Sequence, residues 1–312
     1  MGVFEKTIPP GYAPVSEAEV GSARQRFWYP YVLIAPTMIT LVVVALIPFI
    51  FTIYLSFHQM DFAQVGRFSG ITHYKVLLSN TAFWHSVWVT TIFIAIVVPI
   101  EFALGLLGAL LLHQKIKFRK VVLPLLFVPT MMAPVVVAIL WKIMLAGSWG
   151  LLSYNILERL KIISEISVFG SKELALYGII FVDIWEWTPF MAIAFFAGLQ
   201  SLPMNPYRAA AVDGATPLQI FFRLTLPLMA PLMAVIGLLR FIDAFRIFDT
   251  VFLLTSGGPG SATETVSIFT YKRVFNFWDM GVATATAVVI WILFFIFCNV
   301  FYQIAQKKLK AF

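Results

Sequence analysis

The sequence has 312 residues, of which 61% are hydrophobic and only 12% are charged. Ordinary soluble domains contain about 45–50% apolar and about 25% charged residues, so this composition excludes a soluble globular enzyme and a disordered chain. The net charge of +7 is consistent with attraction to anionic lipid. No basic patch is interleaved with exposed aromatic residues, so we expect no nucleic-acid binding. The single cysteine, Cys298, lies in an apolar run and excludes a disulfide scaffold or a cysteine-based zinc cluster.

Six apolar runs are long enough to cross a membrane. A hydrocarbon core of about 30 Å needs about 20 apolar residues per helix, and lipid tolerates no open sheet edge. The sequence therefore predicts an all-α membrane protein with six transmembrane helices. They cover residues 31–57, 84–112, 121–146, 174–199, 226–254 and 281–305.

The basic residues predict how these helices are oriented. Lys115, Lys117, Arg119 and Lys120 lie in the short gap between the second and third runs, and such clusters favour the cytoplasmic side. With six helices, both termini then lie in the cytoplasm. We expect a cytoplasmic segment at 1–30 without a cleavable signal peptide, a transmembrane domain at 31–305 and a basic cytoplasmic tail at 306–312.

The cytoplasmic loop at 201–225 carries clear helix-boundary signals. Asn205 is a predicted N-cap with Pro206 at the first helical position, and Gly214 stands where a helix ends in a left-handed residue. Thr216 and Gln219 have the spacing of a capping box for a second short helix. The first helix would present small alanine side chains to a docking partner. The alternative is a surface loop that only folds neatly.

Four motifs in chain order resemble one family. They are Trp-Glu-Trp-Thr-Pro-Phe at 185–190, Gly-Leu-Gln-Ser-Leu-Pro at 198–203, Tyr-Arg-Ala-Ala-Ala-Val-Asp-Gly-Ala at 207–215 and Leu-Thr-Ser-Gly-Gly-Pro-Gly at 254–260. The chain resembles the permease subunits of binding-protein-dependent ABC importers. Within that family it resembles the carbohydrate-uptake branch, and there the first of the two permease subunits of the maltose or glycerol-phosphate type. The third motif resembles the EAA loop, which is the coupling loop of that family.

The resemblance implies an assembly in the bacterial inner membrane. This chain would pair with a second homologous permease subunit, two ATPase subunits would dock on the coupling loops, and an extracytoplasmic solute-binding protein would deliver a sugar or polyol. The sequence has no Gly-x-x-x-x-Gly-Lys-Ser/Thr loop to cradle phosphates. We therefore expect no enzyme activity, metal site or cofactor in this chain, and ATP and Mg on the partner ATPase.

The resemblance also implies which residues contact the ATPase. The matching positions are Tyr207, Arg208, Ala209, Ala210, Asp213, Gly214 and Ala215. Arg208 stands where the family motif has its glutamate, so the charge of this contact differs from the family pattern. We hypothesise that a compensating acidic residue lies on the ATPase.

Four charged residues interrupt the fifth apolar run. Arg240, Asp243, Arg246 and Asp249 each lie three residues from the next, and intramembrane charges are expensive enough to suggest a function. Neighbours at this spacing can also pair along a helix as a purely structural feature. In a continuous helix, each step of three residues rotates the side-chain direction around the helix axis by about −60°. We therefore predict Arg240 and Asp249 on opposite faces, so that the four cannot line one pore.

The resemblance places a sugar site at two stretches of the chain. The positions that match sugar-contacting residues of the family are Glu186, Trp187, Phe190, Arg240, Asp243, Ala244 and Ile247. Carboxylates and a guanidinium offer fixed hydrogen-bonding groups for hydroxyls, and aromatic faces can cover the apolar face of a sugar. Helix packing is the alternative for Trp187 and Phe190. Asp183 is either a network partner or an interfacial residue, and we interpret Glu101 as structural.

These observations favour a permease subunit of an ATP-driven importer that works by alternating access. The main alternative is a proton-coupled secondary transporter or channel that uses the charged fifth helix. An enzyme acting in the lipid phase is a third, weaker hypothesis.

Overall fold

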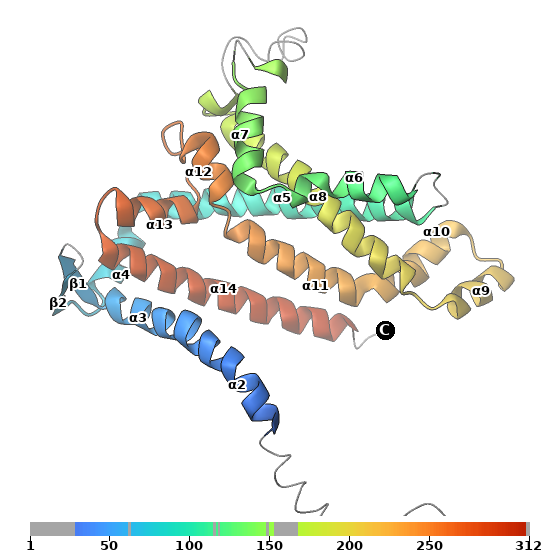
Figure 1. The fold of residues 1–312 in the computed structure, drawn as a ribbon, viewed down its shortest axis with the longest axis horizontal. Helices are drawn as coiled ribbons and strands as arrows, with labels where there is room; N and C mark the ends of the chain where they lie inside the picture. The colour runs from blue at the N-terminus through green and yellow to red at the C-terminus, as the bar shows by residue number, and fades with distance from the viewer. Residues whose placement is uncertain are drawn as a thin grey trace, which may run out of the picture. The chain divides into compact units, whose positions relative to one another are not determined.

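The computed structural model describes residues 29–61, 64–114, 117, 119–147, 150–152 and 168–309. Residues 1–28 of the predicted N-terminal segment and 310–312 of the predicted basic tail lie outside these ranges. The chain divides into two compact units, Met1–Tyr54 and Leu55–Phe312. Each unit is described separately (Figure 1).

The first unit contains an apolar helix. It is built from α2 (Tyr29–Leu41), the π-helical turn η1 (Val42–Leu46) and most of α3 (Ile47–Ser56). The hydroxyls of Thr40 and Thr52 donate to the carbonyls of Pro36 and Pro48 at 2.9 Å. A helix that is apolar all round is typical of a membrane span, which agrees with the first predicted span.

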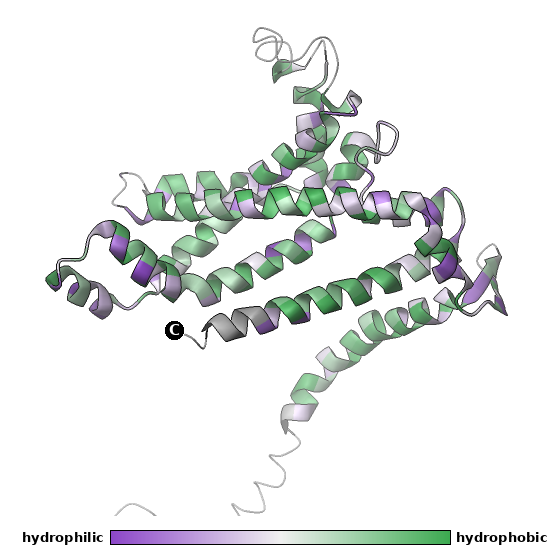
Figure 2. Cartoon of the chain, turned by 180° about the vertical axis from the view of Figure 1, so that it is seen from behind, coloured by the Kyte–Doolittle hydropathy of each residue, from purple (hydrophilic) through white to green (hydrophobic). Residues whose placement is uncertain are grey.

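The second unit contains four further long apolar helices. They are α5 (Thr81–His113), α8 (Ala175–Gln200), α11 (Leu226–Phe245) with its continuation α12 (Asp249–Thr255), and α14 (Met280–Leu309). Among the described residues, five helices are long and apolar enough to cross a membrane, and a sixth span results if a bent helix pair counts as one. Figure 2 shows hydrophobic residues along these helices and hydrophilic residues at their ends.

The third predicted span is not one straight helix. It consists of α6 (Arg119–Met131) and α7 (Pro134–Met144), which meet at an angle of 90°. Pro134 has no amide hydrogen to continue the helix, and Ala133 before it is extended, with φ −66° and ψ 137°, as residues before proline usually are. The prediction of an uninterrupted helix over 121–146 is therefore wrong.

The fifth predicted span is also interrupted. α11 ends at Phe245, the chain turns at residues 246–248, and α12 begins at Asp249. α12 packs on α7, where the Lys142 ammonium donates to the Leu253 carbonyl oxygen at 2.6 Å. This hydrogen bond ties the two interrupted spans together near the end of α12, where a basic group meets the carbonyl end of the helix.

The loop between α8 and α11 folds into two short helices, as predicted. α9 (Met204–Val212) is followed by α10 (Pro217–Ile220), the π-helical turn η4 (Phe221–Thr225) and then α11. The capping box of Thr216 and Gln219 is present. The predicted start of the first helix is wrong, because α9 begins at Met204 with Pro203 as its N-cap.

The predicted left-handed end of α9 is confirmed at Gly214, which has φ +70°. The amide of Ala215 donates to the Ala210 carbonyl at 3.0 Å, and the amide of Gly214 donates to the Ala211 carbonyl at 3.2 Å. This pair of hydrogen bonds is a Schellman motif, which satisfies the last carbonyls of a helix.

Smaller elements connect the long helices. An antiparallel hairpin of β1 (His58–Asp61) and β2 (Gln64–Phe68) follows α3, so the second unit contains two short strands that an all-α prediction omits. The other connecting elements are α4 (Thr72–Ser79), η3 (Val168–Gly170) and α13 (Val266–Phe275).

Helices α5 and α8 share the most extensive contact between elements of the described chain. A side-chain carbon at Gly105 would lie 2.5 Å from Cβ of Met191 and 3.1 Å from its carbonyl carbon. The glycine therefore allows the two backbones to approach closely, as small residues do between membrane helices.

We predict that Gly105→Ala lowers stability by about 1–3 kcal/mol, because the added methyl group overpacks this contact. Gly237→Ala on α11 is the matched control, since its Cβ would meet only the Phe102 ring at 3.6 Å and alanine favours the helix by about 1 kcal/mol. Apparent Tm in detergent measures both variants. Equal Tm values for the two would contradict the close-approach explanation.

Candidate functional site

A polar cavity of about 320 Å³ lies where the two interrupted spans meet α8. Both helix breaks contribute, because Pro134 begins α7 and residues 246–248 join α11 to α12. The lining residues are Pro134, Asp183, Trp187, Arg240, Asp243, Arg246, Ile247, Phe248, Asp249 and Thr250.

The Arg240 guanidinium is the centre of an ion network at this cavity. Its Nε donates to Oε2 of Glu101 at 2.6 Å, and its Nη2 donates to Oε1 of the same carboxylate at 3.0 Å. The Nη2 group also donates to Oδ2 of Asp183. The Nη1 group donates to Oδ2 of Asp243 at 3.2 Å. One side chain of α11 thereby binds carboxylates from α5, α8 and α11 itself.

The network is almost completely closed to solvent. Arg240 is 2% exposed, Asp183 is 3% exposed and Glu101 is 0% exposed, whereas the Asp243 side chain is 39% exposed. Buried charges are tolerated only when paired and hydrogen-bonded. The planar guanidinium suits this arrangement because its fork of donors can bind one carboxylate through two nitrogen atoms and still reach others.

Trp187 forms the aromatic side of the cavity. The Arg240 guanidinium carbon lies 5.1 Å from the centroid of its ring, a distance typical of a cation–π contact. Phe190 meets the Trp187 ring edge-on, with ring centroids 6.0 Å apart, and packs against an apolar cluster around Met191 and Phe195. Phe190 therefore joins the Trp187 ring to this apolar cluster.

The structure brings four of the seven predicted sugar-site residues to the cavity wall: Trp187, Arg240, Asp243 and Ile247. Glu186 is buried on α8, where its main-chain carbonyl accepts a hydrogen bond from the Thr130 hydroxyl at 2.6 Å. Ala244 is 1% exposed and belongs to the apolar core. Glu186 and Ala244 are thus buried away from the wall, and Phe190 contacts it only through the Trp187 ring.

One geometric prediction about the charged residues is wrong. Arg240, Asp243, Arg246 and Asp249 all line the same cavity. The reason is that α11 ends at Phe245, so the rotation of a continuous helix does not apply beyond that residue. Arg246 is 72% exposed at its side chain, and its Nη2 lies 3.5 Å from Oδ1 of Asp243.

The other wall residues differ in how far the sequence indicates them. Asp183 is a network partner of Arg240, which was one of two alternatives for it. Phe248 and Thr250 are not predicted, because they follow the end of α11, Phe248 in the turn and Thr250 at the start of α12. Pro134 carried a usable signal, since a proline inside an apolar run marks a helix break.

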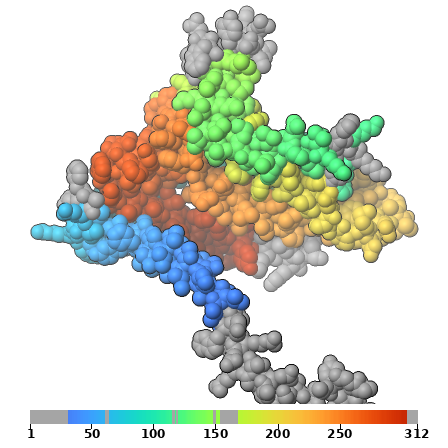
Figure 3. Space-filling view, in the orientation of Figure 1, coloured from blue at the N-terminus to red at the C-terminus, as the bar shows by residue number. Residues whose placement is uncertain are grey.

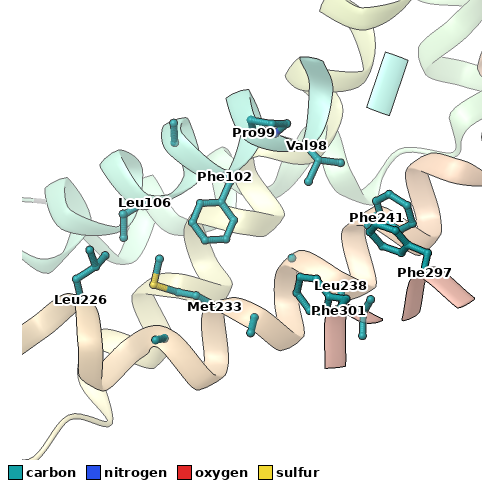
Figure 4. A pocket seen from close by; sticks show the side chains of 14 residues that line it. Val98, Pro99, Phe102, Leu106, Leu226, Met233, Leu238, Phe241, Phe297 and Phe301 are labelled. Carbon is teal, nitrogen blue, oxygen red and sulfur yellow. The ribbon is translucent and has the colours of Figure 1, made fainter. Parts of the chain in front are cut away.

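A second cavity, of about 650 Å³, has a different chemistry (Figure 4). It lies between α5, α11 and α14, and residues such as Phe102, Met233 and Phe241 line it. All fourteen lining residues are apolar, so it offers no side-chain partner for hydroxyl groups.

The residues predicted to contact an ATPase lie on α9 and the turn that follows it. Arg208, Ala209, Asp213 and Gly214 are exposed, while Tyr207, Ala210 and Ala215 are half-buried. The Tyr207 hydroxyl donates to Oγ1 of Thr225 at 3.1 Å. This hydrogen bond joins α9 to the π-helical turn from which α11 starts.

Comparison with known proteins identifies relatives along nearly the whole chain. It is 33% identical over 279 residues to the trehalose/maltose transport system permease protein MalF of Thermococcus litoralis, covering 89% of this chain and 94% of the relative. It is 29% identical over 288 residues to the sn-glycerol-3-phosphate transport system permease protein UgpA of Salmonella typhimurium, covering 91% and 96%.

The fold is also that of a solved transporter. A chain in the crystal structure of a bacterial ABC transporter involved in the import of the acidic polysaccharide alginate superposes with a TM-score of 0.79 at 22% identity, covering 93% of this chain and 99% of that chain. This likeness shows the shared fold.

A family model described as "binding-protein-dependent transport system inner membrane component" matches residues 101–311. That range contains the cavity, the Arg240 network and α9. Together with the relative at 33% identity, it shows that the chain belongs to the binding-protein-dependent permeases of ABC transporters, and to the sugar permeases among them.

Proposed function

We propose that this chain is the permease subunit of an ATP-driven importer that carries a sugar, oligosaccharide or polyol through the membrane by alternating access. The observation that supports it most is the polar cavity among apolar helices, with carboxylates beside an aromatic face. Asp243 presents hydrogen-bond acceptors for hydroxyl groups, and Trp187 presents a flat apolar surface. In this proposal, Trp187, Arg240, Asp243 and Ile247 form the wall, and Glu186, Phe190 and Ala244 support it.

The coupling loop is the proposed docking site for an ATPase. α9 and α10 lie at one end of the second unit (Figure 3), and apolar side chains are exposed there, with Val212 at 89% and Leu218 at 69%. An apolar surface of this kind fits a protein partner. Force applied to α9 would reach α11 through the Tyr207–Thr225 hydrogen bond.

The other components follow from this role. Two ATPase subunits would bind ATP and Mg, a second homologous permease would complete the cavity, and an extracytoplasmic binding protein would deliver the cargo. A solved relative of the same fold is in complex with an alginate pentasaccharide-bound periplasmic protein, which supports the last component. The coupling loop and both termini would then lie in the cytoplasm, with the chain in the inner membrane.

Uptake into proteoliposomes tests the proposal. We expect the chain alone to accumulate no radiolabelled sugar, and the chain with its co-purifying proteins to accumulate sugar only when ATP is supplied. Accumulation by the chain alone that stops when the proton gradient is dissipated would instead establish the secondary transporter.

Gly214→Pro tests the coupling loop. Proline fixes φ near −65° and lacks the amide hydrogen, so it cannot adopt the φ of +70° or donate to Ala211. We expect ATP-dependent uptake to fall about tenfold or more, because proline removes both the left-handed residue and the hydrogen bond that close α9. Gly214→Asn is the matched control and should retain most uptake, since asparagine tolerates the left-handed region.

Arg240→Lys tests the network behind the cavity wall. A lysine ammonium cannot bind Glu101 through two nitrogen atoms while reaching Asp183 and Asp243. We expect a loss of about 1–3 kcal/mol of stability for each buried carboxylate oxygen left without its donor, together with loss of uptake. Arg67→Lys in the exposed strand β2 is the control. Wild-type apparent Tm and uptake in Arg240→Lys would show that the fork of donors is unimportant.

A further inference from the structure

The charge of the cavity wall bears on which cargo the proposed importer accepts. Asp183, Asp243 and Asp249 contribute three carboxylates to the lining, and Arg240 and Arg246 contribute two guanidinium groups. Glu101, directly behind the wall, adds a further carboxylate on Arg240. Carboxylates therefore outnumber cations both in the lining and in the network behind it.

Arg240 has little left to offer an anion. Four hydrogen bonds to Glu101, Asp183 and Asp243 use four of the five N–H groups that a guanidinium carries. The Trp187 ring lies against the Arg240 guanidinium. The Arg240 side chain is only 1% exposed. An anionic cargo would have to displace a carboxylate to reach it.

Arg246, the second cation of the lining, lies between Asp243 and Asp249 in the sequence. Arg246 contacts Asp243 at 3.5 Å, and Asp249 follows three residues later, as the exposed first residue of α12. Among the described residues Asp249 has no ion pair within 4.0 Å. Its carboxylate is therefore not bound directly by any described cation, unlike those of Asp183 and Asp243.

Carboxylates accept hydrogen bonds from hydroxyl groups but repel phosphates, sulfonates and uronates. The repulsion is stronger in a membrane-embedded cavity than in water, because the effective dielectric constant is lower. We propose that this cavity admits uncharged polyhydroxylated molecules and excludes anionic sugars, and that Asp249 is a determinant of this specificity. The inference rests on the proposed function for its cargo, whereas the charge of the wall can be measured independently.

The first experiment measures the potential in the cavity without any cargo. Cys298, the only cysteine of the chain, is replaced by serine and a cysteine is introduced at the wall by Ile247→Cys. The complex purified with its partners then reacts with two methanethiosulfonate reagents, one carrying a trimethylammonium group and one carrying a sulfonate. The measured quantity is the rate of reaction with the cationic reagent divided by the rate with the anionic reagent. We expect this ratio to be about tenfold higher for the introduced cysteine than for a small thiol in solution, because protein clefts of one sign hold potentials of several kT.

The role of Asp249 is tested in the same background. Asp249→Asn should lower this rate ratio several-fold toward that of the small thiol. Glu173→Gln is the matched control, because it removes an exposed carboxylate that does not line the cavity, and it should leave the ratio unchanged. A ratio that favours the anionic reagent, or one that Asp249→Asn does not change, would overturn the proposal.

The second experiment uses cargo directly. The reconstituted complex with its binding protein is offered radiolabelled trehalose, maltose and sorbitol as uncharged probes, and glycerol 3-phosphate and a glucuronate-containing disaccharide as anionic probes. We expect ATP-dependent accumulation of uncharged probes only. Accumulation of an anionic probe would overturn the specificity while supporting the importer. Failure to accumulate any probe, together with a wall measured as negative, would count against the proposed function and not against the charge of the cavity.

Discussion

The pairing of one buried guanidinium constrains the whole second unit. An arginine in the apolar part of a membrane protein is stable only when carboxylates surround it, and Arg240 obtains them from α5, α8 and α11. Because Glu101 is bound through two nitrogen atoms, the rotation of α5 relative to α11 is fixed as well as its distance. The close approach of α5 and α8 at Gly105 holds the third helix in the same register.

The two helix interruptions turn this network into the wall of a cavity. Non-helical backbone is tolerated at membrane depth only where it is buried in protein or lines a cavity, and both the break before Pro134 and the turn after Phe245 lie at the cavity wall. Without the turn, Asp249 would face away from Arg240. The irregular backbone thus concentrates charges that a regular helix would distribute around its circumference.

The sequence predicts some of these features well and others not at all. Apolar runs identify the long helices, and the capping box at Thr216 is local chemistry that needs no tertiary contact. The break before Pro134 has a proline signal, whereas residues 246–248 contain neither proline nor glycine, so nothing local predicts the end of α11. The ion pair of Glu101 with Arg240 joins residues 139 positions apart. It depends on how two helices are rotated against each other, which periodicity alone cannot give.

The same network decides how movement of the coupling loop can reach the cavity. α11 has 20 residues and spans about 30 Å, with the Tyr207–Thr225 hydrogen bond at its start and Arg240 near its end. Tilting α11 alone would separate Arg240 from Glu101 and Asp183, and a buried unpaired charge is too costly to tolerate. In the proposed transport cycle, α5, α8 and α11 would therefore move as one rigid body when α9 is displaced. Rigid-body rotation of such a body against a partner subunit is a recurrent way to switch a protein between states, and it would keep the cavity wall of this chain intact throughout the cycle.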